Sequence, residues 1–358
     1  MVIEQYIITT TQKYNFPQQN MDLTLPKRLF EQSLYSLNRL NHQYLQLNQQ
    51  PLQQITDNNN YRSTLQLRKY PIYLNPCHQD TTIGAVDTST IKIGETSKGT
   101  LIAIRGATIL RQNKKYRYTR IGPFIFHITE RNRNQILKAL EKACYRIQIE
   151  RNQNKPNLMQ LPMHIASLLE KWLQNKIVKK IKDGLILFDG SLTSGTIDSP
   201  LHHMRNILFQ ARANKNTILA FSKITKLRSN GYLITDRLPN HKPPYLLETT
   251  GLSTNLPIVL LGDIYVAKLN KSNYAFRMDI DKETSFKTRK KAVEKLLGND
   301  FLAYGYPETL RLAHILSTFT ANEVVAVKHF LSTKHGIRLI NRPDMHKILF
   351  GPFGKGEN

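Results

Sequence analysis

The chain has 358 residues and a formal net charge of +25, from 51 lysines and arginines against 26 aspartates and glutamates. That length can bury a large core without staples, and the only cysteines, Cys77 and Cys144, have no zinc-binding spacing. No apolar run approaches the roughly 18 residues that a membrane-spanning helix needs, and the first residues lack the pattern of a signal peptide. We therefore expect a soluble protein of a reducing compartment, the cytoplasm, without membrane attachment.

The excess of positive charge indicates a polyanionic partner, and nucleic acid is the first candidate. An anionic membrane is the alternative, but the basic residues are spread along the chain and do not form one juxtamembrane cluster or one basic amphipathic helix. A third interpretation is that the source proteome is simply rich in lysine and asparagine. Charge by itself therefore favours nucleic acid without establishing it.

Residues 1–79 are rich in glutamine and asparagine, and their apolar residues recur at helical spacing. The residues of this apolar series are Phe30, Leu34, Leu37, Leu40, Tyr44 and Leu47. The spacing predicts an N-terminal helical arm, and the polar stretch after it predicts a loop. The sequence leaves three roles open for this arm: it docks a partner, it contacts a second protomer, or it is a plain surface extension.

Strand and helix patterns then follow in a definite order. Residues 83–93, 101–110 and 116–128 read as three strands with short polar breaks, which is typical of hairpins. Helices are predicted at 131–149 and 163–182, followed by a strand at 185–189. The remaining predicted elements are a helix at 200–213, strands at 217–221, 258–267 and 274–280, and helices at 288–297, 307–319 and 322–334. This order predicts a mixed sheet with helices on its faces.

Asp87 and Asp189 each lie on one of the apolar strand-like runs. A carboxylate in an apolar strand is costly to desolvate unless a cation compensates it, and a divalent metal ion often does so. Two such carboxylates on neighbouring strands, with a third from a helix, can hold one or two Mg²⁺ or Mn²⁺ ions roughly 4 Å apart for phosphoryl transfer. Alternatively, Asp87 begins a turn and Asp189 caps a helix near Ser191. In a basic chain, the first interpretation suggests metal-dependent phosphodiester chemistry.

Three short motifs make the pattern more specific: Ala85-Val-Asp-Thr-Ser, Leu187-Phe-Asp-Gly-Ser-Leu and Gly305-Tyr-Pro-Glu-Thr-Leu-Arg-Leu-Ala-His. In this order they resemble the NurA family of archaeal and bacterial DNA-end-processing nucleases, and Phe276-Arg-Met-Asp resembles that family's Arg-x-Asp strand. The resemblance implies an α/β, ribonuclease H-like nuclease domain at residues 80–335, between the arm and a C-terminal tail at 336–358. One departure is Asp87, which is followed by Thr88 where the family often has glycine.

The resemblance also implies a set of site residues. The catalytic residues that it implies are Asp87, Glu170, Asp189, Tyr306 and His314. Of these, it implies that the three carboxylates and His314 bind the metal, Mn²⁺ or Mg²⁺. The motif for Glu170 is only a glutamate on an amphipathic helix, so Glu130, Glu141 and Glu150 remain open as the helical carboxylate.

Tyr306 and His314 are eight residues apart, a little over two helical turns, so one helix that begins near Pro307 could present both on one face. The histidine could bind metal or donate to a phosphate, and the tyrosine could position the phosphate or a water. Without the resemblance, we would interpret His314 as a buried hydrogen-bonded histidine and Tyr306 as a packing residue.

Three further charged residues are not part of the predicted core site. Asp279 and Asp263 lie on strand-like runs, but Arg277 beside Asp279 favours a simple ion pair at a strand end. Lys223 follows the predicted strand at 217–221, where it could contact phosphate as a point charge or be a solvated loop lysine.

The resemblance implies a metal-dependent DNA nuclease with 5′-to-3′ exonuclease activity on single- and double-stranded DNA and endonuclease activity on single strands. It further implies a homodimer that works with a HerA-type hexameric ATPase in DNA-end resection for double-strand break repair. The chain has no GxxxxGK[ST] motif, so such a motor would be a separate protein. The alternatives are a non-catalytic DNA-end-binding or assembly subunit, and another ribonuclease H-like enzyme, such as a junction resolvase or an RNA-cleaving nuclease.

Overall fold

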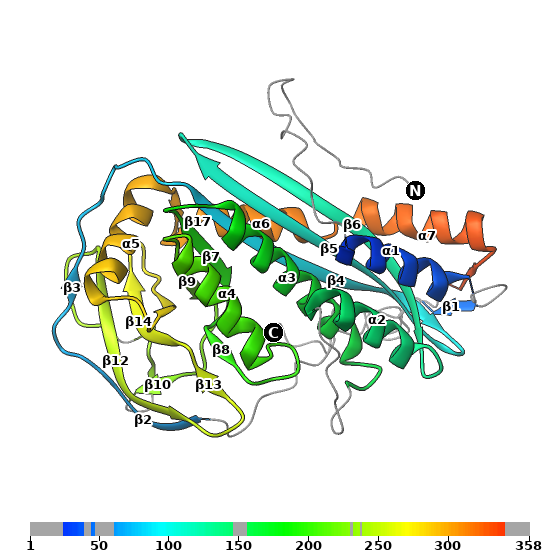
Figure 1. The fold of residues 1–358 in the computed structure, drawn as a ribbon, viewed down its shortest axis with the longest axis horizontal. Coiled ribbons are helices and arrows are strands. Elements are labelled where there is room, and N and C mark those ends of the chain that lie inside the picture. The colour runs from blue at the N-terminus through cyan, green and yellow to red at the C-terminus, as the bar shows by residue number, and fades with distance from the viewer. Residues whose placement is uncertain are drawn as a thin grey trace, which may run out of the picture.

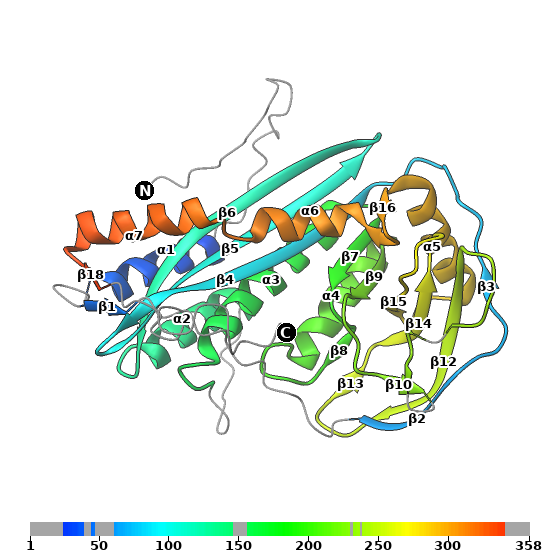
Figure 2. The ribbon, with the colours of Figure 1, turned by 180° about the vertical axis from the view of Figure 1, so that it is seen from behind.

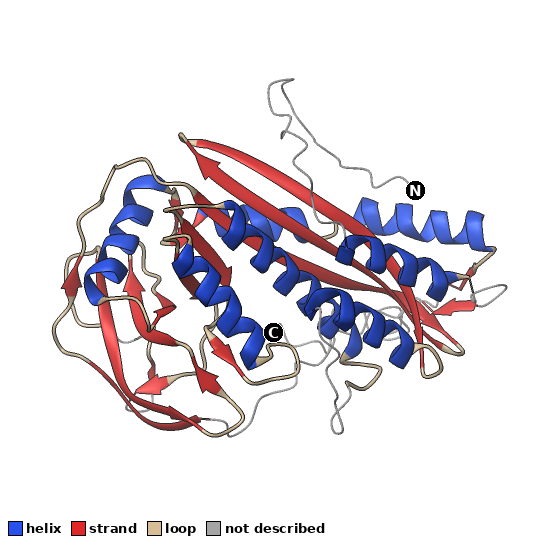
Figure 3. Ribbon diagram, viewed as in Figure 1, coloured by secondary structure: helices blue, strands red, loops and turns tan. Residues whose placement is uncertain are grey.

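The computed structural model describes residues 24–38, 44–46, 61–145, 156–229, 232–236 and 238–340. In this part of the chain, one long twisted sheet runs through the molecule and helices lie along both of its faces (Figure 1, Figure 3). The sheet has the strand order β18-β1-β4-β7-β9-β15-β14-β12-β2, with β5 and β6 continuing from β4, and β3 beside β12. The expected mixed sheet flanked by helices is confirmed.

The centre of the sheet has the arrangement that the resemblance to a ribonuclease H-like fold implies. Strands β4 (Ile83–Thr96), β5 (Gly99–Gln112) and β6 (Lys115–Thr129) form an antiparallel meander. Strands β7 (Leu185–Asp189) and β9 (Thr217–Ser222) lie parallel to β4 on its other side. The resulting order, β6-β5-β4-β7-β9, is that of a ribonuclease H-like sheet.

An antiparallel extension continues the sheet from β9. Its strands are β15 (Phe276–Asp281), β14 (Gly262–Lys268), β12 (Tyr245–Thr254), β2 (Tyr61–Leu67) and β3 (Ile72–Tyr73). The short pairs are β8 (Thr193–Ser194) with β13 (Val259–Leu260), β10 (Arg228–Ser229) with β11 (Tyr232–Leu233), and β16 (Leu302–Ala303) with β17 (Tyr306–Pro307). The predicted strand at 258–267 is therefore divided between β13 and β14.

The helical prediction for the arm is correct only in part. Helix α1 (Thr24–Leu37) is present, and its Leu25 and Leu29 are completely buried in the main apolar cluster. The predicted helical series does not continue to Tyr44, because Tyr44–Gln46 forms strand β1, which pairs with β4 and with β18 (Arg338–Ile340). Leu40 and Leu47 of that series lie outside the described residues.

The helices divide between the two faces of the sheet. Helices α2 (Arg133–Tyr145), α3 (Leu161–Lys180) and α4 (Leu201–Ala213) share one apolar cluster with α1, and the rest of the predicted helix 131–149 lies outside the described residues. The opposite face carries α5 (Phe286–Asn299), α6 (Glu308–Ser317) and α7 (Ala321–His335), with α6 and α7 nearly end to end (Figure 2). None of the described helices is long and apolar enough to cross a membrane.

The pairing of β4 determines where polar groups can gather. Ile83 and Ala85 pack toward α5 and α6, whereas Val86 packs toward α3, as the two-residue period of a strand requires. Strand β4 pairs with β7 only as far as Val86, although it runs on to Thr96. Asp87 is thus the first residue beyond the shared ladder, where side chains from both helical layers can approach the sheet.

Candidate metal centre

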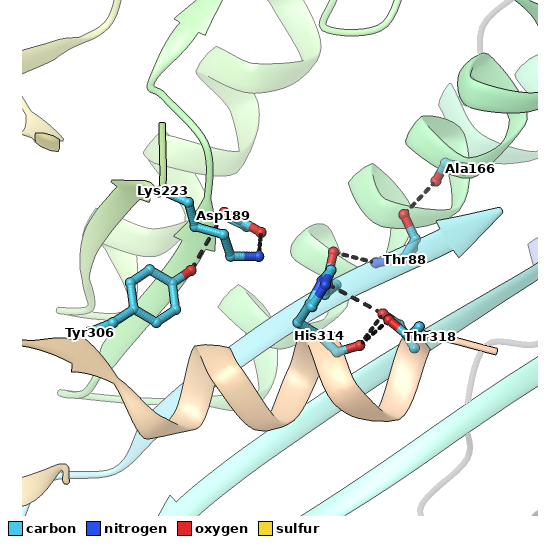
Figure 4. Close-up of polar contacts among 9 residues, drawn as sticks. Thr88, Ala166, Asp189, Lys223, Tyr306, His314 and Thr318 are labelled. Atoms are coloured by element: carbon cyan, nitrogen blue, oxygen red, sulfur yellow. Dashed lines mark hydrogen bonds and ion pairs between the residues drawn. The ribbon is translucent and has the colours of Figure 1, made fainter. Parts of the chain in front are cut away.

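Asp87, Asp189 and His314 each bring one potential ligand atom to within 4.8 Å of the others. They come from β4, from the carboxyl end of β7, and from α6 on one face of the sheet (Figure 4). His314 Nδ1 lies 2.8 Å from Asp87 Oδ2, and the hydroxyl of Ser317 donates to the same oxygen at 3.3 Å. Two carboxylates and one imidazole form a donor set that suits a divalent ion such as Mn²⁺.

The Asp87 carboxylate is buried and held in place from two sides. Its Oδ1 accepts a hydrogen bond from the Thr88 backbone N–H at 2.8 Å, and the Thr88 hydroxyl donates to the Ala166 carbonyl oxygen of α3 at 3.2 Å (Figure 4). Burial raises the pKa of Asp87 and the neighbouring Asp189 adds to the rise, while the hydrogen bond with His314 opposes it. The ionised form of Asp87 is therefore costly in its buried position, and a bound cation would favour it.

Asp189 is contacted by a lysine and a tyrosine. Lys223 Nζ donates to Asp189 Oδ2 at 2.6 Å, and the Tyr306 hydroxyl lies 3.5 Å from Asp189 Oδ1 (Figure 4). The Tyr306 ring packs edge-on against Phe221 and Phe276, with centroid separations of 6.0 and 5.3 Å. Burial raises the pKa of Tyr306, and both aspartates add to this, so the phenol keeps its proton and can act as a donor.

Glu170 approaches from α3, on the other face of the sheet. Its Oε1 accepts a hydrogen bond from Gln174 Nε2 at 2.8 Å. Burial raises the pKa of Glu170 to about 7; Lys171 opposes the rise, whereas the charges of Asp87 and Asp189 add to it. Glu170 is therefore within electrostatic range of both aspartates, as a third carboxylate of the centre would be.

The other proposed glutamates have different surroundings. Glu141 lies 3.3 Å from His164 Nε2, and the exposed Glu130 pairs with Arg133 at 2.9 Å. Glu150 lies outside the described residues. Among the glutamates of this set that the structure describes, Glu170 is the one whose pKa the charges of the two aspartates raise, and it lies outside the group of Asp87, Asp189 and His314 whose ligand atoms converge.

The structure places the remaining candidates as follows. Arg277 donates to both carboxylate oxygens of Asp279, at 2.8 and 2.7 Å, and Asp263 forms an ion pair with Arg289. The ion-pair interpretation of Asp279 is confirmed, and neither aspartate belongs to the cluster of Asp87, Asp189 and His314.

Two residues of the centre were not anticipated from the sequence. Ser317 lies one helical turn after His314, and Gln174 lies one turn after Glu170, so both share a helix face with a residue already singled out. This spacing of three or four residues is the signal that could have identified them.

No family model matches the chain, and no curated protein matches it. Similar solved structures include the NurA nuclease from Sulfolobus solfataricus, with 14% identity over 75% of this chain and 86% of that one, at a TM-score of 0.45. A second NurA structure has 11% identity over 74% and 91%, at a TM-score of 0.39. Endonuclease V from Bacillus subtilis has 12% identity over 74% and 89%, at a TM-score of 0.33. The structural neighbours thus include the family that the motifs resemble, and the chemistry of the site is judged from its own geometry.

Proposed function

We propose that this chain is a divalent-metal-dependent deoxyribonuclease whose centre is formed by Asp87, Glu170, Asp189 and His314. The observation that carries the proposal is the convergence of Asp87, Asp189 and His314, from three separate elements, to within 4.8 Å. The net charge of +25 attracts a polyanion such as DNA.

The residues fit a divalent cation. Asp87 is buried, and its pKa is raised by burial and by Asp189, so its ionised form is costly without a compensating cation. Asp87, Asp189 and His314 would hold the ion, with Glu170 facing them from α3. A bound Mn²⁺ or Mg²⁺ would act as a Lewis acid toward phosphate and would lower the pKa of water.

The surrounding residues are suited to binding and orienting a phosphate. The His314 side chain is exposed, so it can contact a substrate while it also contacts Asp87. Tyr306 keeps its phenolic proton and can donate to a phosphate oxygen or orient a water. The Lys223 side chain is 38% exposed, so its ammonium group can leave Asp189 and bind a phosphate instead, as a point charge.

The motifs described above support a narrower form of the proposal. The enzyme would degrade single- and double-stranded DNA in the 5′-to-3′ direction, cut single strands internally, and act as a homodimer with a HerA-type translocase in the resection of broken ends. The nuclease domain would be residues 80–335, with the arm at 1–79 and the tail at 336–358 as appended segments. Burial of Leu25 and Leu29 against the sheet suggests that the arm's helix also stabilises this domain.

The test is cleavage of end-labelled single- and double-stranded DNA with Mn²⁺, Mg²⁺ or EDTA. Metal-dependent cleavage that is lost in Asp189→Ala is expected, and the label that is released first gives the polarity. Asp263→Ala is the matched control, because it removes a strand carboxylate outside the centre. DNA binding without cleavage under any metal would contradict the proposal and favour an assembly subunit. A preference for four-way junctions or RNA–DNA hybrids would favour another ribonuclease H-like activity.

A further inference from the structure

Two exposed tyrosines meet at the hairpin turn that precedes α6. Tyr274 precedes β15 and Tyr304 lies on the turn between β16 and β17; their rings are 6.1 Å apart and perpendicular. The two residues are 59% and 73% exposed, so the pair presents aromatic surface to solvent rather than to the core.

The backbone at Tyr304 is unfavourable for a bulky residue. Ala303 pairs with Tyr306, so Tyr304 and Gly305 form a two-residue hairpin turn, with φ of 54° and 90°. Such a turn needs positive φ at both positions, and asparagine followed by glycine satisfies it with the least strain. A tyrosine in the left-handed region is uncommon. Turn formation therefore does not explain why an exposed aromatic ring occupies this position.

The loop that carries Tyr274 is bound to the turn that carries Tyr304. The Ser272 hydroxyl donates to the Tyr304 carbonyl oxygen at 2.8 Å, and Asn270 Nδ2 donates to the Leu302 carbonyl oxygen at 3.3 Å. Lys268 Nζ also donates to the carbonyl oxygen of Tyr274 at 3.3 Å. The arrangement of the two rings is thus supported by the backbone beneath them.

A second aromatic pair follows the first along the chain, and one of its members reaches the acidic centre. Two residues beyond Tyr274 and Tyr304 lie Phe276 and Tyr306, whose ring centroids are 5.3 Å apart. The hydroxyl of Tyr306 lies 3.5 Å from Asp189 Oδ1, and Lys223 Nζ lies 5.8 Å from the centroid of the Tyr306 ring. Tyr306, two residues beyond Tyr304, therefore links this aromatic segment of the chain to Lys223 and Asp189.

We propose that Tyr274 and Tyr304 form a stacking platform for an unpaired base of single-stranded nucleic acid whose backbone lies at Lys223 and Asp189. Aromatic rings beside a cationic contact are how proteins hold single strands, because every base has a flat face to stack. The bases of a duplex are already stacked on one another, so the platform selects a single-stranded segment or end. The inference rests on the proposed function, since it places the substrate of that same centre.

The test is fluorescence anisotropy in EDTA with the full chain and two labelled probes of equal length, oligothymidylate and an abasic deoxyribose phosphate oligomer. Tyr304→Asn removes the ring while supplying the residue that the turn prefers, and Tyr274→Ala removes the other ring. Each should weaken oligothymidylate binding about tenfold and leave binding of the abasic probe within about twofold. Phe209→Ala, an exposed aromatic on α4, is the control and should change neither affinity.

The proposal is overturned if wild-type protein does not prefer the probe that carries bases, or if both variants bind like wild type. Equal losses for the two probes would also overturn it, because they would show a general effect on the surface. Since these measurements contain no metal, they do not depend on catalysis. Loss of base preference in the variants, together with no metal-dependent cleavage by wild type, would refute the proposed nuclease activity and leave the platform standing.

Discussion

Asp87 and Asp279 both lie on strands of the same sheet and both are buried, yet their surroundings differ. Asp279 receives two hydrogen bonds from Arg277, and the Leu192 backbone N–H donates to it at 3.0 Å. That carboxylate has its own cation within the fold. Asp87 instead lies close to a second carboxylate, Asp189, and its hydrogen-bond partners are a histidine and a serine.

The difference separates a structural carboxylate from one that is suited to bind a metal. The Arg277 side chain is 7% exposed, so it cannot move to another partner without leaving the buried charge of Asp279 unpaired. Lys223, the cation beside Asp189, is 38% exposed and can leave at small cost. Burial of a carboxylate alone therefore does not identify a metal centre; an excess of carboxylates over fixed cations does.

The largest expected effect is on the structural pair. Arg277→Met should lower the free energy of unfolding by about 3–5 kcal/mol, because it leaves Asp279 buried without its cation. Lys223→Met is the matched control and should cost no more than about 1 kcal/mol. Urea denaturation of both variants measures the two losses. Similar losses would show that the two carboxylates do not differ in the way described.

At the proposed metal centre, loss of a carboxylate should affect activity rather than stability. Asp87→Asn is expected to reduce Mn²⁺-dependent DNA cleavage about 100-fold or more, since even outer-shell changes at metal sites cost about 10- to 100-fold. Initial rates on single-stranded DNA, with DNA binding measured in parallel, give the result. A rate close to wild type would exclude Asp87 from the centre.

A third effect depends on pH. The pKa of Glu170 in the folded protein is about 7, against an ordinary value of 4.5, so between these values the folded state binds more protons than the unfolded state. The free energy of unfolding of the metal-free wild type therefore falls as pH rises through this window, by up to roughly 3 kcal/mol. In the Glu170→Gln variant the side-chain amide does not titrate, so this fall in the free energy of unfolding does not occur.

Thermal unfolding in EDTA tests the direction of this pH dependence. Glu170→Gln should have a higher Tm than wild type at about pH 8.5 and a similar Tm at about pH 4.5. Addition of Mn²⁺ at the higher pH should raise the Tm of wild type more than that of the variant. The same Tm difference at both pH values would show that the pKa of Glu170 is not raised in the folded protein.

The smallest expected effect concerns the exchangeable cation. Lys223→Met should strengthen Mn²⁺ binding in the absence of DNA by up to about fivefold, because it removes a positive charge beside Asp189. Isothermal titration calorimetry measures the change. Unchanged or weaker Mn²⁺ binding would indicate that Lys223 does not compete with a metal ion at this carboxylate.

Local patterns in the sequence were sufficient for the parts of the fold that depend on local periodicity. The strand predicted at 185–189 coincides with β7, and the three strands of the meander are each found within a few residues of their predicted bounds. Asp87 and Asp189 stood out because each interrupts an apolar run. Their convergence follows from β4 and β7 being neighbours, an arrangement that the resemblance to a ribonuclease H-like fold implies.

Features that depend on distant partners were missed. Strand β12 was not predicted, because its second half is polar, partly exposed and interrupted by Gly251, and it is stabilised by pairing with β2. Tyr44 fits a helical period but lies on β1, where β4 and β18 supply its neighbours. The contact of Ser317 with Asp87 likewise joins residues 230 positions apart, which no local pattern contains.

The most direct test of the metal centre is an anomalous difference map from crystals of the protein grown with Mn²⁺. The account predicts a peak between the carboxylates of Asp87 and Asp189, within bonding distance of the His314 imidazole, and no peak at Asp279. A map without a peak at Asp87 and Asp189, from protein that cleaves DNA with Mn²⁺ in solution, would contradict it.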